Sequence, residues 1–133
     1  MRYEIPPSLR TWFLIHFVVD MLFGIPLLLF PAWTLSLFGL AAGEPLTARL
    51  VGAALLGIGG ISVLARDAEP ETYRHLLTMK LIWSGSAIVG IVLSIVEGAP
   101  STAWLFLATF AVFFSVWVYY WVRLNGSKPE VRP

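Results

Sequence analysis

The sequence predicts an all-α integral membrane protein: a four-helix transmembrane bundle with a short interfacial helix after the first span. Of its 133 residues, 58% are hydrophobic and 13% are charged, whereas about a quarter of an ordinary soluble domain is charged. The apolar residues gather in four long segments, each close to the roughly 20 residues that a helix needs to cross a bilayer. The alternating pattern of a membrane barrel is missing, so helices are expected.

The spans follow one another closely in one domain of residues 1–133, as this length suggests. The ten residues from Pro31 to Leu40 are too few to span, and their apolarity and Trp33 predict a helix lying flat at the interface. The first span is longer than the apolar core of a signal peptide and is expected to be retained. The predicted spans are residues 9–30, 46–65, 73–96 and 102–124.

Basic residues lie on one side of this topology. They occupy the start of the chain, the loop between the second and third spans, and the tail: Arg2, Arg10, Arg66, Arg74, Arg123, Lys128 and Arg132. The positive-inside rule therefore predicts that both termini are cytoplasmic. We expect a multi-pass protein of a bacterial or archaeal plasma membrane, with the lipid bilayer as its partner. A net charge of +1 gives no reason to expect nucleic-acid binding.

The first span carries an ionisable pair near its middle. Asp20 lies close to the membrane midplane, where a carboxylate costs roughly 2.5–3.5 kcal/mol on insertion scales. His16 lies one turn away on the same face. Side chains lean toward the N-terminus of their helix, and the first and third spans both start at the cytoplasmic side. Asp20 and Lys80 of the third span should therefore both lean toward the cytoplasm. We therefore predict one polar cluster of His16, Asp20 and Lys80, with Ser84 one turn beyond Lys80, as a ligand or proton site.

Two structural alternatives to a functional cluster stay open at this point. Lys80 is long enough to reach the inner interface by itself, and the whole cluster could be an ion pair that fixes helix register. Arg49 belongs to the second span, which starts at the outer side of the membrane, so its side chain should lean toward the outer surface. It is expected to form a second, outer ion pair with Glu44 or Glu97.

The helices differ in how they are expected to pack. Small residues of the second span, such as Gly52, and of the third, such as Gly90, predict a tight seam between these two helices. The fourth span carries bulky aromatic residues on all sides. These predict a surface that faces lipid, a second copy of the chain or a partner membrane protein, and an aromatic-lined pocket is the alternative.

The residue inventory limits the chemistry. The chain has no cysteine, so thiolate metal sites and thiol catalysis are excluded. A bis-histidine haem would need His16 and His75 at equal depth, but His75 lies roughly 7–10 Å closer to the surface. The same difference argues against a metal site. We predict no cofactor, with haem or quinone as the alternatives, and no catalytic residue.

One pattern of glycines and prolines is familiar. It runs through FGIPLLLFPAWTLSLFGL and ARLVGAALLGIGG and rests on Gly24, Pro31, Gly39, Arg49, Gly52 and residues 57–60. This pattern, which covers about half of the chain, resembles the DoxX-like and DUF4345-type small membrane proteins. The resemblance implies a four-helix bundle, and some DoxX-like members are linked to quinone or thiol redox systems. This chain has no cysteine, so it lacks the residue that a thiol redox role requires.

Three functional hypotheses follow. The first is that the protein binds or moves a small solute, a proton or a lipophilic molecule at an interior site around Asp20. The second is an accessory or assembly subunit without catalysis, whose polar cluster only fixes helix register and whose interior is filled. The third is a membrane-embedded redox or lipid enzyme, with His16 and Asp20 as an acid–base pair. A cavity that reaches Asp20 would favour the first.

Overall fold

The computed structural model describes residues 4–126, which form five α-helices and no strand. Four of the helices are long and apolar enough to cross a membrane, which confirms the all-helical fold with four helices of spanning length. The position of the short second helix at the membrane interface stays a prediction. The helices are α1 (Pro7–Leu29), α2 (Pro31–Leu37), α3 (Pro45–Leu64), α4 (Pro70–Val96) and α5 (Thr102–Gly126).

Proline and glycine set the helix boundaries. Helices α1 to α4 each begin with a proline in the first turn, where its missing N–H would have had no partner within the helix. The carboxylate of Glu44 accepts a hydrogen bond of 2.9 Å from the backbone N–H of Leu46 at the start of α3. Gly39 and Gly98 have φ values of +66° and +93° after α2 and α4, a backbone conformation that favours glycine.

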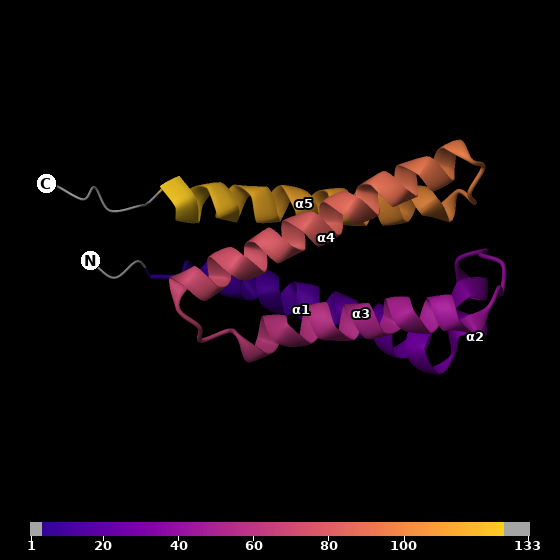
Figure 1. Cartoon of the computed structure of the whole chain (residues 1–133), viewed down its shortest axis with the longest axis horizontal. Coiled ribbons are helices and arrows are strands. Elements are labelled where there is room, and N and C mark those ends of the chain that lie inside the picture. The colour runs from indigo at the N-terminus through magenta and orange to yellow at the C-terminus, as the bar shows by residue number, and fades with distance from the viewer. Residues whose placement is uncertain (1–3, 127–133) are drawn as a thin grey trace, which may run out of the picture.

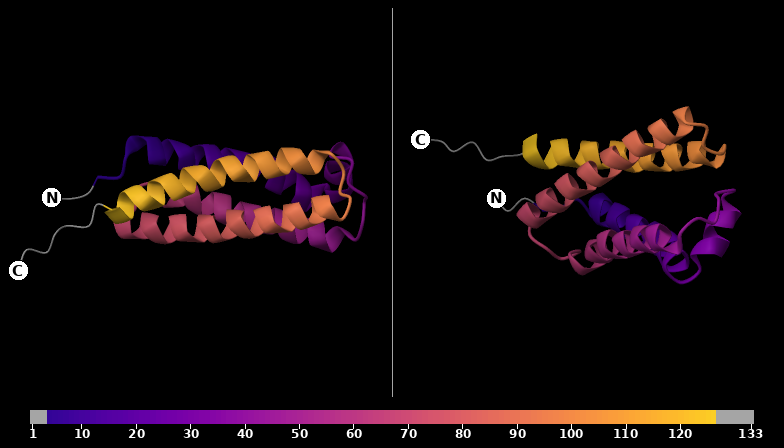
Figure 2. Two further views of the ribbon diagram at one scale, coloured as in Figure 1. Left: turned by 90° about the horizontal axis from the view of Figure 1, so that it is seen from above. Right: turned by 45° about the vertical axis from the view of Figure 1, so that its right-hand side comes forward.

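The long helices form two hairpins. Helix α1 packs along α3, and α4 packs along α5 (Figure 1). The hairpins meet at the end of the bundle where α1 begins and α5 ends, and they diverge toward the opposite end (Figure 2). The bundle is therefore a wedge, and its two ends differ in how tightly they are packed.

The tightest seam lies between α1 and α3, so the predicted seam between the second and third spans is wrong. A Cβ atom added to Gly52 would lie 2.8 Å from the carbonyl oxygen of Gly24 and 2.8 Å from the backbone nitrogen of Leu28. Backbones that approach this closely leave room only for glycine. Gly90 of α4, by contrast, has no neighbour within 4 Å of such an added atom.

An aromatic core joins the hairpins at the closed end of the wedge. The ring of Phe13 in α1 lies 4.9 Å from the ring of Tyr73 in α4 and 5.6 Å from that of Trp117 in α5. The Tyr73 hydroxyl donates a hydrogen bond of 2.8 Å to the carbonyl oxygen of Arg66. The buried members of this core are Ile5, Leu9, Phe13, Tyr73, Leu77, Phe113, Trp117, Tyr120 and Leu124.

A thinner contact bridges the open end. The Thr102 hydroxyl at the start of α5 donates a hydrogen bond of 2.6 Å to the carbonyl oxygen of Phe38, which follows α2. The rings of Phe38 and Phe106 lie 5.1 Å apart. The two hairpins thus touch at both ends, and the space between these contacts is available for a cavity.

Candidate functional site

Lys80 lies at the centre of a buried polar cluster. Its side chain has no exposed surface, and its ammonium nitrogen lies 2.9 Å from Nδ1 of His16 and 2.7 Å from the hydroxyl oxygen of Ser62. The same nitrogen lies 4.9 Å from the ring centre of Phe13 and 5.1 Å from that of Trp117. Two hydrogen-bond acceptors and two aromatic faces therefore replace the water that a buried ammonium gives up.

His16 stands between a cation and a carboxylate. Its Nδ1 atom faces the Lys80 ammonium and also lies 3.2 Å from Oδ2 of Asp20. A ring nitrogen without a proton can accept a hydrogen bond from Lys80, and one with a proton can donate to Asp20, but one nitrogen cannot do both. A single proton on Nδ1 therefore decides which partner His16 bonds.

Asp20 is nine-tenths buried but poorly satisfied. Its Oδ2 atom is enclosed, and within residues 4–126 no group donates a hydrogen bond to it. Gly59 of α3 packs directly against it, since an added Cβ atom there would lie 2.6 Å from the Asp20 Cβ atom and 3.0 Å from Oδ2. The charge of Asp20 thus faces the rest of the cluster without a full set of donors.

Two serines flank Lys80 in different ways. The hydroxyl of Ser84 donates a hydrogen bond of 2.6 Å to the backbone carbonyl of Lys80 itself, whereas Ser62 contacts the ammonium group and donates to the carbonyl of Ile58. Sequence reasoning missed Ser62. Its spacing of three residues from Gly59 places both on one helix face, which was the available signal.

The structure brings together the inner residues that the sequence singled out: His16, Asp20, Lys80 and Ser84. The ammonium of Lys80 stays inside the bundle with its two acceptors, so the alternative in which it reaches the inner interface is wrong.

The outer residues are not brought together. Arg49 donates a hydrogen bond of 3.3 Å from Nε to the carbonyl oxygen of Leu28, and the carboxylate of Glu44 caps α3. Within the described part of the chain, no ion pair joins Arg49 to Glu44 or Glu97. His75 is exposed on α4, whereas His16 is buried, so the two histidines do not face each other.

A cavity of about 890 Å³ leads from the polar cluster into the open part of the wedge. His16, Asp20 and Ser84 line its inner end. Glu44 and Ala99, in the segments that follow α2 and α4, line it at the other end. The cavity therefore connects the deeply buried ionisable groups with the end of the bundle opposite to the chain termini.

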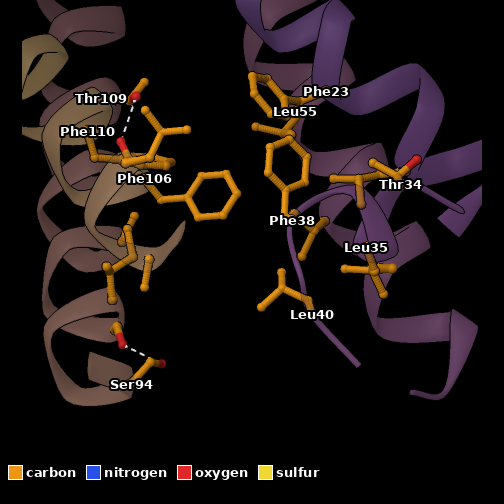
Figure 3. A pocket seen from close by; sticks show the side chains of 18 of the residues that line it. Phe23, Thr34, Leu35, Phe38, Leu40, Leu55, Ser94, Phe106, Thr109 and Phe110 are labelled. Carbon is orange, nitrogen blue, oxygen red and sulfur yellow. Dashed lines mark hydrogen bonds between the residues drawn. The ribbon is translucent and has the colours of Figure 1, made fainter. Parts of the chain in front are cut away.

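The cavity walls between these ends are mainly aromatic and aliphatic. Figure 3 shows Phe106 and Phe110 of α5 on one side, and Phe38 and Leu35 facing them across the gap. The walls also hold Trp83, whose indole Nε1 atom is buried and has no hydrogen-bond acceptor within residues 4–126. The aromatic residues of α5 are thus divided between this cavity, the core and the exposed surface.

Residues 4–126 contain no group of three His, Cys, Asp or Glu side chains that could hold a metal ion. The resemblance to DoxX-like proteins stays a prediction. Comparison with known proteins finds no matching family model, no matching curated protein and no matching solved structure.

Proposed function

We propose that this membrane protein binds a lipophilic molecule with a small polar end group in the cavity between its two hairpins. The observation that carries the proposal is the shape of the cavity, with apolar walls and a polar inner end. Its volume of about 890 Å³ falls within the roughly 300–1,000 Å³ of small-molecule sites, which are mostly apolar with a few polar groups that fix orientation.

The unpartnered polar atoms suggest the chemistry of the end group. Among residues 4–126, two of the three buried side-chain atoms without a hydrogen-bond partner belong to residues that line this cavity, Asp20 and Trp83. One is an acceptor and the other a donor. A hydroxyl group both donates and accepts, so a long-chain alcohol is a suitable probe, with its hydroxyl at Asp20 and its chain along the aromatic walls.

The cavity also favours ligand binding over the hypothesis of a purely structural cluster. A bundle whose polar residues serve only to fix helix register gains stability from a filled interior, because every void forfeits packing. The accessory-subunit hypothesis predicts such a filled interior. The open space beside Asp20 is what a binding site requires.

The test uses the full chain in lipid nanodiscs and compares 1-dodecanol with dodecane at equal mole fractions. A ligand that binds only the folded state raises the unfolding midpoint as its concentration rises. We expect dodecanol to raise the midpoint of the wild-type protein and dodecane to have a smaller effect. Equal effects of the two probes would contradict a polar end group at Asp20.

Two matched variants separate binding in the cavity from general membrane effects. Ala87→Phe places a ring inside the cavity, which Ala87 lines, and should abolish the response to dodecanol. Ala111→Phe makes the same substitution at an exposed position of α5 and should retain the response. If both variants respond as the wild type does, the alcohol acts on the bilayer and the proposal fails.

A further inference from the structure

A second, smaller pocket approaches the same polar cluster from the other end of the bundle. It has a volume of about 260 Å³, and Ser62 forms part of its wall. Arg10 and Asp67 line it as well, and they form an exposed ion pair with a distance of 3.4 Å between Nη1 and Oδ1. These charged residues lie at the end of the bundle that the positive-inside rule assigns to the cytoplasm.

Between the two spaces runs an unbroken series of polar side chains, here named the polar chain: Asp20, His16, Lys80 and Ser62. The successive distances are 3.2 Å from Asp20 Oδ2 to His16 Nδ1, 2.9 Å from Nδ1 to Lys80 Nζ, and 2.7 Å from Nζ to the Ser62 hydroxyl. Its first members line the large cavity, and its last member lines the small pocket.

We propose that the polar chain passes protons between the two spaces and therefore across the membrane. This inference goes beyond ligand binding and does not require the lipophilic molecule. Chains of ionisable side chains are the usual proton carriers of membrane interiors. Every link of this chain is within or close to hydrogen-bond distance, and each of its members can gain and lose a proton or, for the serine, exchange one.

The transfer balances with one proton entering and one leaving. Lys80 releases a proton through the Ser62 hydroxyl to water in the small pocket and becomes a neutral amine. Asp20, protonated from water in the large cavity, then passes this proton to the unprotonated Nδ1 of His16, whose other ring nitrogen keeps its own proton. The resulting imidazolium gives the Nδ1 proton to the Lys80 amine, so Asp20, His16 and Lys80 all return to their starting charges.

The surroundings of the polar chain favour protons over larger ions. The rings of Phe13 and Trp117 cover the Lys80 ammonium, and Phe113 and Trp117 pack edge-on against the His16 ring, with centroid distances of 4.8 Å and 5.3 Å. His16, Lys80 and Ser62 are all buried. A hydrated metal cation has no path through such packing, whereas a proton needs only short steps between neighbouring polar atoms.

The test is proton flux into liposomes that contain the full chain, the pH dye pyranine, and valinomycin with potassium to prevent the build-up of charge. We expect the wild-type protein to dissipate a pH gradient faster than protein-free liposomes do. Lys80→Met should lower this rate by about a hundredfold, since a positioned proton-transfer group contributes at least that much. Wild-type proteoliposomes no faster than empty ones would overturn the proposal.

A pair of serine variants distinguishes the loss of a proton-transfer link from a general loss of folding. Ser62→Ala removes one link of the polar chain and should slow the flux. Ser115→Ala removes a hydroxyl that makes the same kind of bond, to the carbonyl four residues earlier, on the exposed side of α5, and should leave the flux unchanged. Equal rates for the two variants would overturn the proposal. So would a wild-type protein that dissipates a sodium gradient as fast as a proton gradient, because that outcome shows an open leak.

Discussion

At the scale of single residues, the buried ammonium group of Lys80 explains why the bundle interior holds other polar side chains. Moving an ammonium group out of water costs several kcal/mol unless other groups solvate it. Here His16 and Ser62 accept its hydrogen bonds, while Asp20 supplies the opposite charge through His16. Because three helices contribute to this arrangement, the cluster ties both hairpins together near the middle of the bundle.

The mutual dependence of Lys80 and Asp20 can be measured by the free energy of unfolding in mixed micelles. Lys80→Met leaves a buried carboxylate without its cation and should destabilise the protein by about 3–5 kcal/mol. Asp20→Leu should also destabilise it, and the double variant should be more stable than the sum of the two losses allows, by about 0.5–3 kcal/mol. Strict additivity would contradict the coupling.

The control for this cycle is an exposed cation. Arg66 lies 3.4 Å from Asp67, and their side chains are 70% and 77% exposed. Because water already solvates such a pair, Arg66→Met should change the free energy of unfolding by less than about 1 kcal/mol. A loss as large as that of Lys80→Met would show that removing any cation harms this protein.

At the scale of the elements, glycine decides which helices pair. In lipid, apolar faces are not driven together by water, so helices associate where their backbones can approach closely. Gly24 and Gly52 allow this between α1 and α3. Gly57 lies on the same helix as Gly52, yet an added Cβ atom there would have no neighbour within 4 Å. The two positions therefore separate the contribution of packing from that of helix propensity.

We expect Gly52→Ala to lower the free energy of unfolding by about 1–3 kcal/mol, because the new methyl group meets backbone atoms that cannot turn away. Gly57→Ala should be neutral or stabilising by up to about 1 kcal/mol, since alanine is the better helix former. Thermal or denaturant unfolding of the purified variants provides the comparison. If Gly57→Ala were the more harmful of the two, the α1–α3 seam would not have the geometry described above.

At the scale of the whole molecule, the wedge shape makes the two ends of the bundle differ in packing. The closed end holds the aromatic core, and the open end holds the mouth of the large cavity (Figure 2). The positive-inside rule assigns the closed end to the cytoplasm. In this predicted orientation the large cavity opens away from the cytoplasm, so the proposed ligand would enter from the outer half of the membrane.

The orientation can be tested by cysteine labelling, because the chain has no cysteine of its own. Glu69→Cys and Ser101→Cys place single thiols at exposed positions in the loops at opposite ends of the bundle. A membrane-impermeant maleimide should label the Ser101 variant in intact cells and the Glu69 variant only after permeabilisation. The reverse pattern would show that the cavity opens to the cytoplasm.

The sequence by itself determined the all-helical fold with four helices of spanning length, and it predicted that Asp20 has polar neighbours inside the bundle. These features are local: hydropathy defines a span, proline and glycine end a helix, and lipid offers no solvent to an unpaired carboxylate. The direction in which side chains lean along a helix was enough to select Lys80 rather than Arg49 as the neighbour of this cluster.

Only the tertiary structure decided which helices pair, which serine solvates Lys80 and where the bundle is hollow. Small residues on several spans could each have formed a seam, and in lipid no difference in hydrophobicity selects among them. The seam between α1 and α3, rather than between α3 and α4, lets the hairpins diverge. That divergence opens the cavity beside Asp20. The α1–α3 seam itself depends on the close approach between Gly24 and Gly52, which is visible only in the folded backbone.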